Sequence, residues 1–402
     1  MQIDIEYRPG TEPSIHARVT WEDSQRQTGT VKLGGAVVQN APAGDALLLM
    51  TFVPALRHGE KRIRINAEIS PILEDNLAVA AGWLNRWHGA SRVIPKVDAP
   101  RCTSGQRAAA TASAFVSGGV DSMFTLLRRQ RLHPTEGSAY PRKALMAFGT
   151  SYKDYVDREM SFARFQRDVE TVRAFSSSLE LELAVVIADF LFLDPSPMVW
   201  MREYHGSALA GLAHATVNTP TLFYIGSTND IENMVPWGPH PLLDAHFSSE
   251  LVRFEHDGEA YSRLDKLRYI VEHSEDALRS LIVCNKRVAT VPNCGRCEKC
   301  VRTKLELRAL HQDVDGIFED SSFDLDMMRE VLKIDGAYVA SCYRDLLRPL
   351  RGSGDRGIRR LIEHRLRGYR IRRTRGQFTD ALKRVDGEML NGTLKRTARA
   401  LR

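Results

Sequence analysis

Between about residues 108 and 283, short apolar runs alternate with longer stretches that have helical periodicity. The apolar runs predict strands at Ser113–Val116, Ala144–Phe148, Leu183–Ala188 and Thr221–Ile225. The intervening stretches predict helices at Ser122–Arg129, Asp157–Ser177 and Met201–Val217. Strands that alternate with helices pair in parallel through helical crossovers, so this region predicts a doubly wound α/β domain. Such sheets bind ligands beyond the carboxyl ends of their strands.

The residues before this region have a different pattern. Period-two stretches separated by turn residues predict strands at Gln2–Tyr7, His16–Trp21 and Thr30–Val38, and a helix is predicted at Pro71–His88. A chain of 402 residues exceeds the usual size of one domain. We expect three parts, namely a β-rich N-terminal domain at 1–100, the α/β domain at 101–310 and a helical, basic C-terminal region at 311–402.

Three features of the sequence bear on the cellular compartment of the protein. It has no run of about 18 apolar residues, and Met1–Tyr7 lacks the apolar segment of a secretory signal. Four of the six cysteines fall between Cys284 and Cys300, whereas a disulfide framework would spread them along a short secreted chain. These features predict a cytoplasmic protein without a transmembrane segment, and they leave its oligomeric state open.

A glycine-rich hexapeptide follows the first strand of the α/β region, and it consists of Ser117, Gly118, Gly119, Val120, Asp121 and Ser122. A strand, a glycine turn and a helix N-terminus form an anion site, because backbone N–H groups can approach phosphate oxygens and the helix dipole adds positive charge. Ser117 and Ser122 can donate hydroxyls to a leaving pyrophosphate. Asp121 would repel a bare phosphate, which indicates Mg²⁺ between the two. The alternative is a Gly-Gly turn with a polar helix cap.

This Ser-Gly-Gly-x-Asp-Ser sequence resembles the signature of the PP-loop ATP pyrophosphatases, which belong to the adenine nucleotide alpha hydrolase superfamily. The resemblance covers roughly residues 108–310 and implies a Rossmann-like fold that cleaves ATP to AMP and pyrophosphate. It implies that a carboxylate or carbonyl oxygen of a substrate is adenylated and that a nitrogen or sulfur nucleophile then displaces AMP. Ser117, Asp121 and Ser122 would be the catalytic residues.

The resemblance assigns two further turns to the nucleotide. Phe148 and Gly149 end the second strand, where family members hold adenine with backbone groups. Gly226 and Ser227 end the fourth strand, where the family closes over the nucleotide. Without the family, each is a polar turn after a buried strand.

The segment that follows Gly226 departs from the family's base-recognition segment, so the acceptor substrate stays open. It contains His240, Asp244 and His246, which can read the acceptor or act as a base for an incoming amine. The alternative is a polar surface loop.

The four clustered cysteines predict a metal site made of Cys284, Cys294, Cys297 and Cys300. Cys-x2-Cys spacing lets two sulfurs reach one tetrahedral ion, and Gly295 permits the tight turn between them. Zinc fits four thiolates, and an Fe–S cluster is the rival. The pattern after a PP-loop domain resembles the structural zinc site of the 7-cyano-7-deazaguanine synthases, which implies a structural role here.

Basic residues gather at the C-terminus. Residues 351–402 hold 16 Lys and Arg against 5 Asp and Glu, while the whole chain has a formal net charge of +6. Interleaved apolar residues at Leu361, Ile362, Leu366 and Ile371 predict an amphipathic helix. Its basic face can contact a nucleic acid or an anionic lipid surface, or it can be a solvated face packed on its own domain.

The leading expectation is an ATP-dependent ligase that forms a C–N product on a small molecule or a modified macromolecule. A second is a PP-loop enzyme that modifies RNA and holds it with the basic tail. A third is a nucleotide-binding protein without turnover. Release of AMP and pyrophosphate separates the first two expectations from the third.

Overall fold

The computed structural model describes residues 1–8, 13–23, 26, 28–36, 43–102, 111–216, 221–284, 291–351 and 355–389, with side chains as far as Arg375 in the last helix. Contacts divide the chain into two units, Met1–Asn293 and Cys294–Arg402. The boundaries expected at residues 100 and 310 concern parts that fold independently, and they stay predictions. The contacts divide the chain between Asn293 and Cys294.

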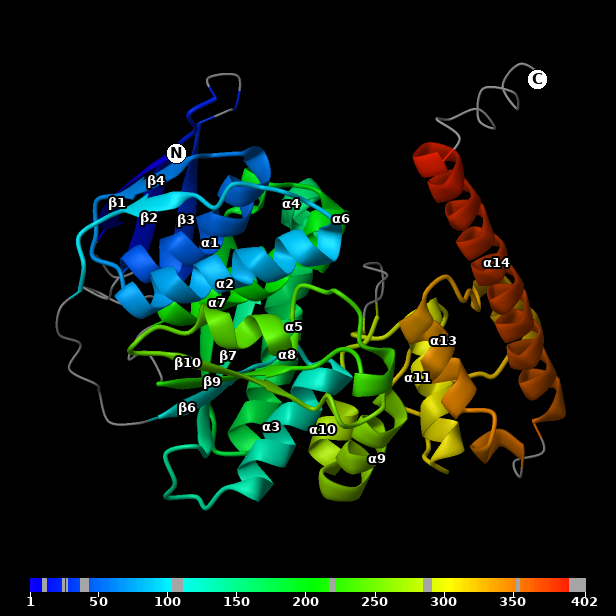
Figure 1. The fold of residues 1–402 in the computed structure, drawn as a ribbon. Helices are drawn as coiled ribbons and strands as arrows, with labels where there is room; N and C mark the ends of the chain where they lie inside the picture. Colours follow the sequence, from blue (N-terminus) through cyan, green and yellow to red (C-terminus); the bar gives the residue numbers. More distant parts are fainter. Residues whose placement is uncertain are drawn as a thin grey trace. The chain divides into compact units, whose positions relative to one another are not determined.

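Within the described residues, the first unit contains one ten-stranded sheet (Figure 1). Its strands are β1 (Gln2–Arg8), β2 (Ser14–Thr20), β3 (Gly29–Gly35), β4 (Arg62–Ile65), β5 (Lys96–Asp98), β6 (Ala112–Phe115), β7 (Pro141–Phe148), β8 (Glu182–Asp189), β9 (Leu222–Gly226) and β10 (Arg253–Asp257). Their spatial order is β10-β9-β6-β7-β8-β3-β2-β1-β4-β5. Strands β6 to β10 pair in parallel with one another, and β3 joins β8 in antiparallel pairing. The N-terminal strands therefore extend the sheet of the α/β region.

The helices of the first unit connect these strands. They are α1 (Ala43–His58), α2 (Pro71–His88), α3 (Val120–Leu132), α4 (Tyr152–Val156), α5 (Arg158–Ser178), α6 (Pro197–Val199), α7 (His205–His214), α8 (Pro241–Asp244), α9 (Arg263–His273) and α10 (Glu275–Arg279). Short 3₁₀ turns are η1 (Leu191–Leu193), η3 (Ile231–Asn233) and η4 (Ala245–Phe247), and η2 (Trp200–Tyr204) is a π-helical turn that leads into α7.

Helices cover both faces of the parallel part of the sheet. On β10, Phe254 stacks with His214 of α7, whereas Asp257 binds Arg128 of α3. Residues three positions apart on a strand point to opposite faces, so α7 and α3 lie on different sides. Helix α1 packs against α7, and α3 packs against α9. The predicted α/β class with a mostly parallel sheet is confirmed.

The sequence-based elements match the structure closely in most places. Helix α2 spans the predicted Pro71–His88, and Ser70 caps it by accepting the N–H of Leu73. The predicted helix at Met201–Val217 is interrupted, because η2 occupies its first turn before α7 begins; Val217 lies outside the described residues. Helix α1 was not predicted, and the N-terminal part is therefore less purely β-rich than the sequence indicated.

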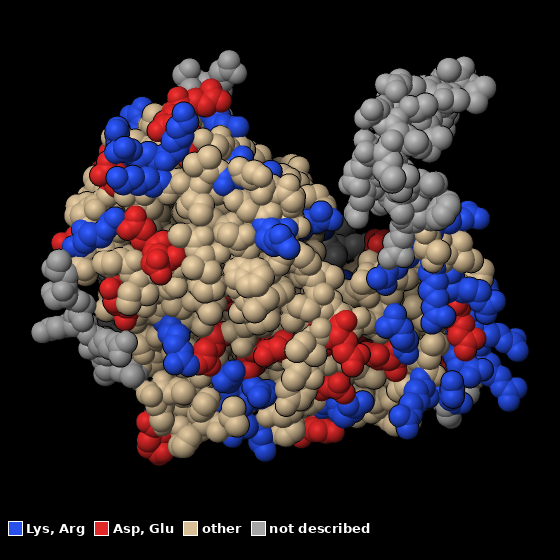
Figure 2. Space-filling model, viewed as in Figure 1, with Lys and Arg blue, Asp and Glu red and all other residues tan. Residues whose placement is uncertain are grey.

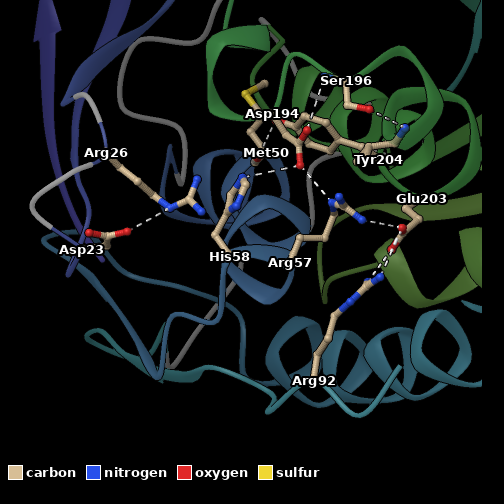
Figure 3. Close-up of polar contacts among 11 residues, drawn as sticks. Asp23, Arg26, Met50, Arg57, His58, Arg92, Asp194, Ser196, Glu203 and Tyr204 are labelled. Atoms are coloured by element: carbon tan, nitrogen blue, oxygen red, sulfur yellow. Dashed lines mark hydrogen bonds and ion pairs between the residues drawn. The ribbon is translucent and has the colours of Figure 1, made fainter. Parts of the chain in front are cut away.

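A buried ion-pair network joins α1 to the segment before α7 (Figure 3). Arg57 donates from Nε to Asp194 Oδ2 at 2.9 Å and from Nη1 to Glu203 Oε1 at 2.8 Å. Arg92 also binds the carboxylate of Glu203, and His58 lies 3.5 Å from Asp194 Oδ2. Burial is the main cause that lowers the pKa of His58. Both carboxylates are about 5% exposed and both have arginine partners, so the network fastens the N-terminal half of the unit to the α/β half.

Replacement of Arg57 by methionine is expected to lower the free energy of unfolding by about 3 kcal/mol, because it removes a partner from two buried carboxylates. The matched control is Arg62→Met, whose guanidinium pairs with the exposed Asp98 and is expected to cost less than about 1 kcal/mol. Urea denaturation of both variants measures the difference. Equal losses in the two variants would contradict the assigned role of the network.

The second unit is helical in its described residues. It contains α11 (Glu298–Ala309), α12 (Leu325–Val331), α13 (Ala337–Asp345), the short turn η5 (Pro349–Arg351) and α14 (Arg356–Met389). Helix α14 contacts α12 and α13. Among the described residues of the whole chain, no helix is long and apolar enough to cross a membrane.

Candidate nucleotide and metal sites

The strand order creates a topological switch point beside β6. The chain runs outward from β6 to β7 and β8, then returns through α7 to β9 on the other side of β6. In open α/β sheets, ligands bind at the carboxyl ends of the strands where the order reverses. The hexapeptide Ser117–Ser122 follows β6 and the turn at Gly226 ends β9, so the fold brings both predicted segments to this point.

The hexapeptide forms an accessible turn at the start of α3. Ser117 is exposed, and Gly119, Asp121 and Ser122 are partly exposed. Ser122 Oγ accepts the N–H of Ser117 at 3.1 Å, lies 3.3 Å from Ser117 Oγ and donates to Gly119 O at 3.0 Å. Gly119 is the N-cap residue, and no described side chain caps this helix. The first backbone N–H groups of α3 are therefore oriented for an anion, beside two hydroxyls.

Glycine is required at the second position of the turn. Gly118 has a φ of +73°, and a Cβ there would lie 2.7 Å from the side chain of Ile282. Its carbonyl accepts the N–H of Ile282 at 2.8 Å. The segment that leads to Cys284 is thus tied directly to the glycine turn.

A buried lysine links the two sides of the switch point. Lys266 of α9 is 1% exposed, and its Nζ lies 3.1 Å from Asp121 Oδ1. The same ammonium donates to the carbonyl oxygen of Ser227. A Cβ at Gly226 would lie 2.9 Å from the carbonyl oxygen of Asp121, so the β9 turn and the start of α3 are in close contact. The cation that the glycine turn itself lacks is supplied by α9.

Lys266 was missed at the level of sequence, although a signal was present. It follows Ser262 and Asp265, which form a capping box at the start of α9. Lys266 then occupies the apolar face of the helix together with Arg263, Leu267 and Ile270, at intervals of three and four residues. A lysine on a buried face needs an anionic or carbonyl partner, which points to a polar site below the helix.

The other nucleotide candidates have mainly structural side-chain contacts. Ser227 Oγ donates to Asn229 O at 2.6 Å, so its hydroxyl stabilises its own turn. Phe148 is buried against the aromatic rings of α5. Gly149 has a φ of +84°, and a Cβ there would lie 2.1 Å from Ala188 O. The groups that these turns could present to a nucleotide are therefore backbone groups at the ends of β7 and β9.

Two of the residues predicted to recognise the acceptor substrate lie together in the structure, and a third residue contacts one of them. Asp244 accepts the backbone N–H of His240 at 3.2 Å and lies 2.7 Å from Nδ1 of His256 on β10. Burial raises the pKa of Asp244, against the opposing effect of His256. His240 caps α8, and burial lowers its pKa to about 4. His246 is partly exposed. The contacts of Asp244 and His240 fasten this loop to β10 and α8.

The four clustered cysteines fit a tetrahedral metal site. Their sulfur atoms all lie within 4.8 Å of one another, and Cys294 Sγ is 4.0 Å from Cys300 Sγ. A tetrahedral Zn–S₄ centre with bonds of about 2.3 Å requires S–S distances of about 3.8 Å. None of the four forms a disulfide. The donor set therefore suits a thiophilic ion such as zinc, as the spacing predicted.

The surroundings of two of these cysteines stabilise negative charge. Cys297 is the N-cap residue of α11 and Cys300 lies in its first turn, where the helix dipole favours thiolates. Gly295 has a φ of +72° and contacts Asp320, which Arg296 binds at 2.6 Å. Lys304 is fully buried and donates to the carbonyl oxygen of Asp320 at 2.8 Å, while its burial lowers its pKa. Arg296 and Lys304 partly offset the charge of a four-thiolate site.

Comparisons with protein-family models, with curated proteins and with solved structures gave no match for this chain. The class of protein is therefore inferred from the fold and the sites alone. The chain has a doubly wound α/β unit with a glycine turn at its switch point, together with a four-cysteine cluster suited to a metal ion.

Proposed function

We propose that this chain is an adenylating enzyme of the PP-loop type. It binds ATP with the triphosphate over Ser117–Ser122 and transfers AMP to a carboxylate or carbonyl oxygen of its substrate. The P–O bond between the α- and β-phosphates breaks, and pyrophosphate leaves. The observation that carries the proposal is the accessible glycine turn at the switch point, with Lys266 joining it to the β9 turn.

The polar residues of the turn have distinct physical roles in this scheme. The N–H groups at the start of α3 and the hydroxyls of Ser117 and Ser122 hold the pyrophosphate as its charge increases. Lys266 fixes Asp121 and adds positive charge behind the turn. The second oxygen of the Asp121 carboxylate is the ligand that we assign to an Mg²⁺ ion carried in by ATP, which would supply further charge neutralisation. Backbone at Phe148 and Gly149 would hold the adenine, as in the family that the turn resembles.

The second half of the reaction uses a nitrogen nucleophile. It attacks the adenylated carbon, the bond from this carbon to the AMP oxygen breaks, and AMP leaves as an amide or related product forms. The acceptor enters beside the segment that contains His240 and Asp244, since this segment differs from the family pattern and lies next to β10. The acceptor is a small molecule or a modified macromolecule.

Analysis of the nucleotide products tests the proposal. Purified protein, ATP and Mg²⁺ are incubated with a panel of carboxylates and ammonia, and the products are separated by anion-exchange chromatography and identified by mass spectrometry. AMP and pyrophosphate in equal amounts are expected. Formation of ADP and phosphate would contradict the proposed cleavage site. Tight ATP binding with no product under any condition would favour a nucleotide-binding protein without turnover.

A further inference from the structure

The described part of α14 combines a docked apolar face with an arginine-rich one. From Arg356 to Arg375 the helix has nine arginines, no lysine and a single acidic residue, Glu363. Ile358, Ile362 and Leu366 on the other side are buried, and α14 contacts α12 and α13. The helix is therefore held in place through one face while it presents another.

Four exposed arginines form a stripe beside the buried face. At 3.6 residues per turn, one line along the helix contains Arg356, Arg360, Arg367 and Arg370, and Glu363, which lies 3.8 Å from Arg359, falls on the same line. A rise of about 1.5 Å per residue spreads this arginine stripe over about 21 Å. Figure 2 shows Lys and Arg gathered over the described part of α14. Within the residues that the structure describes, no carboxylate pairs with any of the four.

Other arginines of the same helix have a different use. Arg365 donates to the carbonyl oxygen of Arg329, and Arg372 donates to that of Ile334 at 2.8 Å. Arg359 lies 3.8 Å from Glu363. These contacts stay within the second unit and hold α14 in place. Among the described residues, none of the four stripe arginines has a contact of this kind.

We propose that the arginine stripe binds the phosphate backbone of a nucleic acid. A guanidinium group matches phosphate oxygens with two parallel hydrogen bonds, so a row of arginines suits a regular polyphosphate. A membrane is a poorer partner, because an amphipathic helix binds lipid through its apolar face and that face is buried here. The proposal does not depend on the ATP chemistry, and together the two would make the acceptor a macromolecule.

The test compares two variants of the full chain that lose the same charge. The stripe variant replaces the four stripe arginines by glutamine, which keeps a good helix former at each position. The matched variant makes the same change at four arginines of the first unit, the partly exposed Arg62 and the exposed Arg64, Arg173 and Arg279. Both lower the formal net charge of +6 by four. Circular dichroism confirms that each variant keeps its helix content.

Fluorescence anisotropy measures binding to a single-stranded RNA, a duplex RNA and a duplex DNA at several salt concentrations. The stripe variant is expected to bind on the order of 10- to 100-fold more weakly at low salt, with the slope of log K against log salt smaller by about 3 to 4. The matched variant should stay within about threefold of wild type. The three probes distinguish RNA from DNA as the source of the backbone.

Three outcomes would overturn the proposal. Absence of wild-type binding to all three probes at low salt excludes a nucleic-acid surface. An equal loss in both variants assigns any binding to net charge and not to the stripe. Binding to phosphatidylserine vesicles that the stripe variant loses, without binding to nucleic acid, makes α14 a membrane surface. If neither the wild type nor the two variants form AMP from ATP, the proposed enzyme function is wrong. The measured binding of nucleic acid by the arginine stripe does not depend on that outcome.

Discussion

Removal of a metal ion from the four-cysteine cluster with a strong chelator is expected to unfold the second unit. Structural zinc contributes about 10 to 16 kcal/mol of apparent binding free energy in small zinc-binding folds. This equals or exceeds the total stability of a typical domain, which is about 5 to 15 kcal/mol. Cys297 and Cys300 begin α11, and Gly295 contacts Asp320, so loss of the ion would release the start of the unit. Limited proteolysis and the loss of helical circular dichroism measure the effect.

Substitution of single cysteines sharpens this test. Cys297→Ser should lower the bound metal from one ion per chain, and it should destabilise the protein in proportion. Cys102→Ser is the matched control, since Cys102 lies outside the cluster. Elemental analysis counts zinc and iron, and visible absorption would reveal an Fe–S cluster. A Cys297→Ser chain that stays as stable as wild type but loses activity would contradict a structural role for the metal.

The second large effect concerns the buried lysine at the switch point. If the chain cleaves ATP as proposed, Lys266→Met is expected to reduce kcat/KM for ATP by about 100-fold or more, because it removes a preorganised positive charge beside the proposed pyrophosphate site. Asp121→Asn should have an effect of similar size. If the two residues act as a unit, the double variant will lose no more kcat/KM than the more damaging single substitution, which is the pattern expected of coupled groups.

Lys143→Met is the matched control for Lys266→Met. Lys143 likewise pairs with a carboxylate, Glu182 at 3.0 Å, but it belongs to the parallel sheet and lies near the amino end of β7. Steady-state release of pyrophosphate is measured for all variants, with thermal unfolding as a check on folding. Comparable rates in Lys266→Met and Lys143→Met would remove Lys266 from the proposed site.

The alternation of strands and helices predicted the parallel part of the fold well. Apolar runs such as Ala144–Phe148 and Leu183–Ala188 fall inside β7 and β8, because strands buried on both faces are continuously apolar. Helix α1 was missed for the same physical reason. Thirteen of its sixteen residues are buried, so it has no polar stripe from which a helical period could be recognised. The continuity of the sheet from β8 to β3 depends on long-range pairing, which local patterns do not contain.

The sites were predicted unequally for a related reason. The glycine turn and the cysteine cluster lie in short segments with fixed spacing, so their residues are visible in the sequence. Lys266 reaches its partner Asp121 across 145 positions, and His256 reaches Asp244 across 12. Single residues of this kind give only an indirect signal, such as a charged side chain on an apolar face.

The contact between Gly118 and Ile282 has one further consequence. Cys284 lies only two positions beyond Ile282, so the chain that supplies the first thiolate also forms a wall of the glycine turn. An ion bound by the thiolates would brace that wall from a distance. If ATP binds at the glycine turn as proposed, its affinity is expected to fall when the ion is lost.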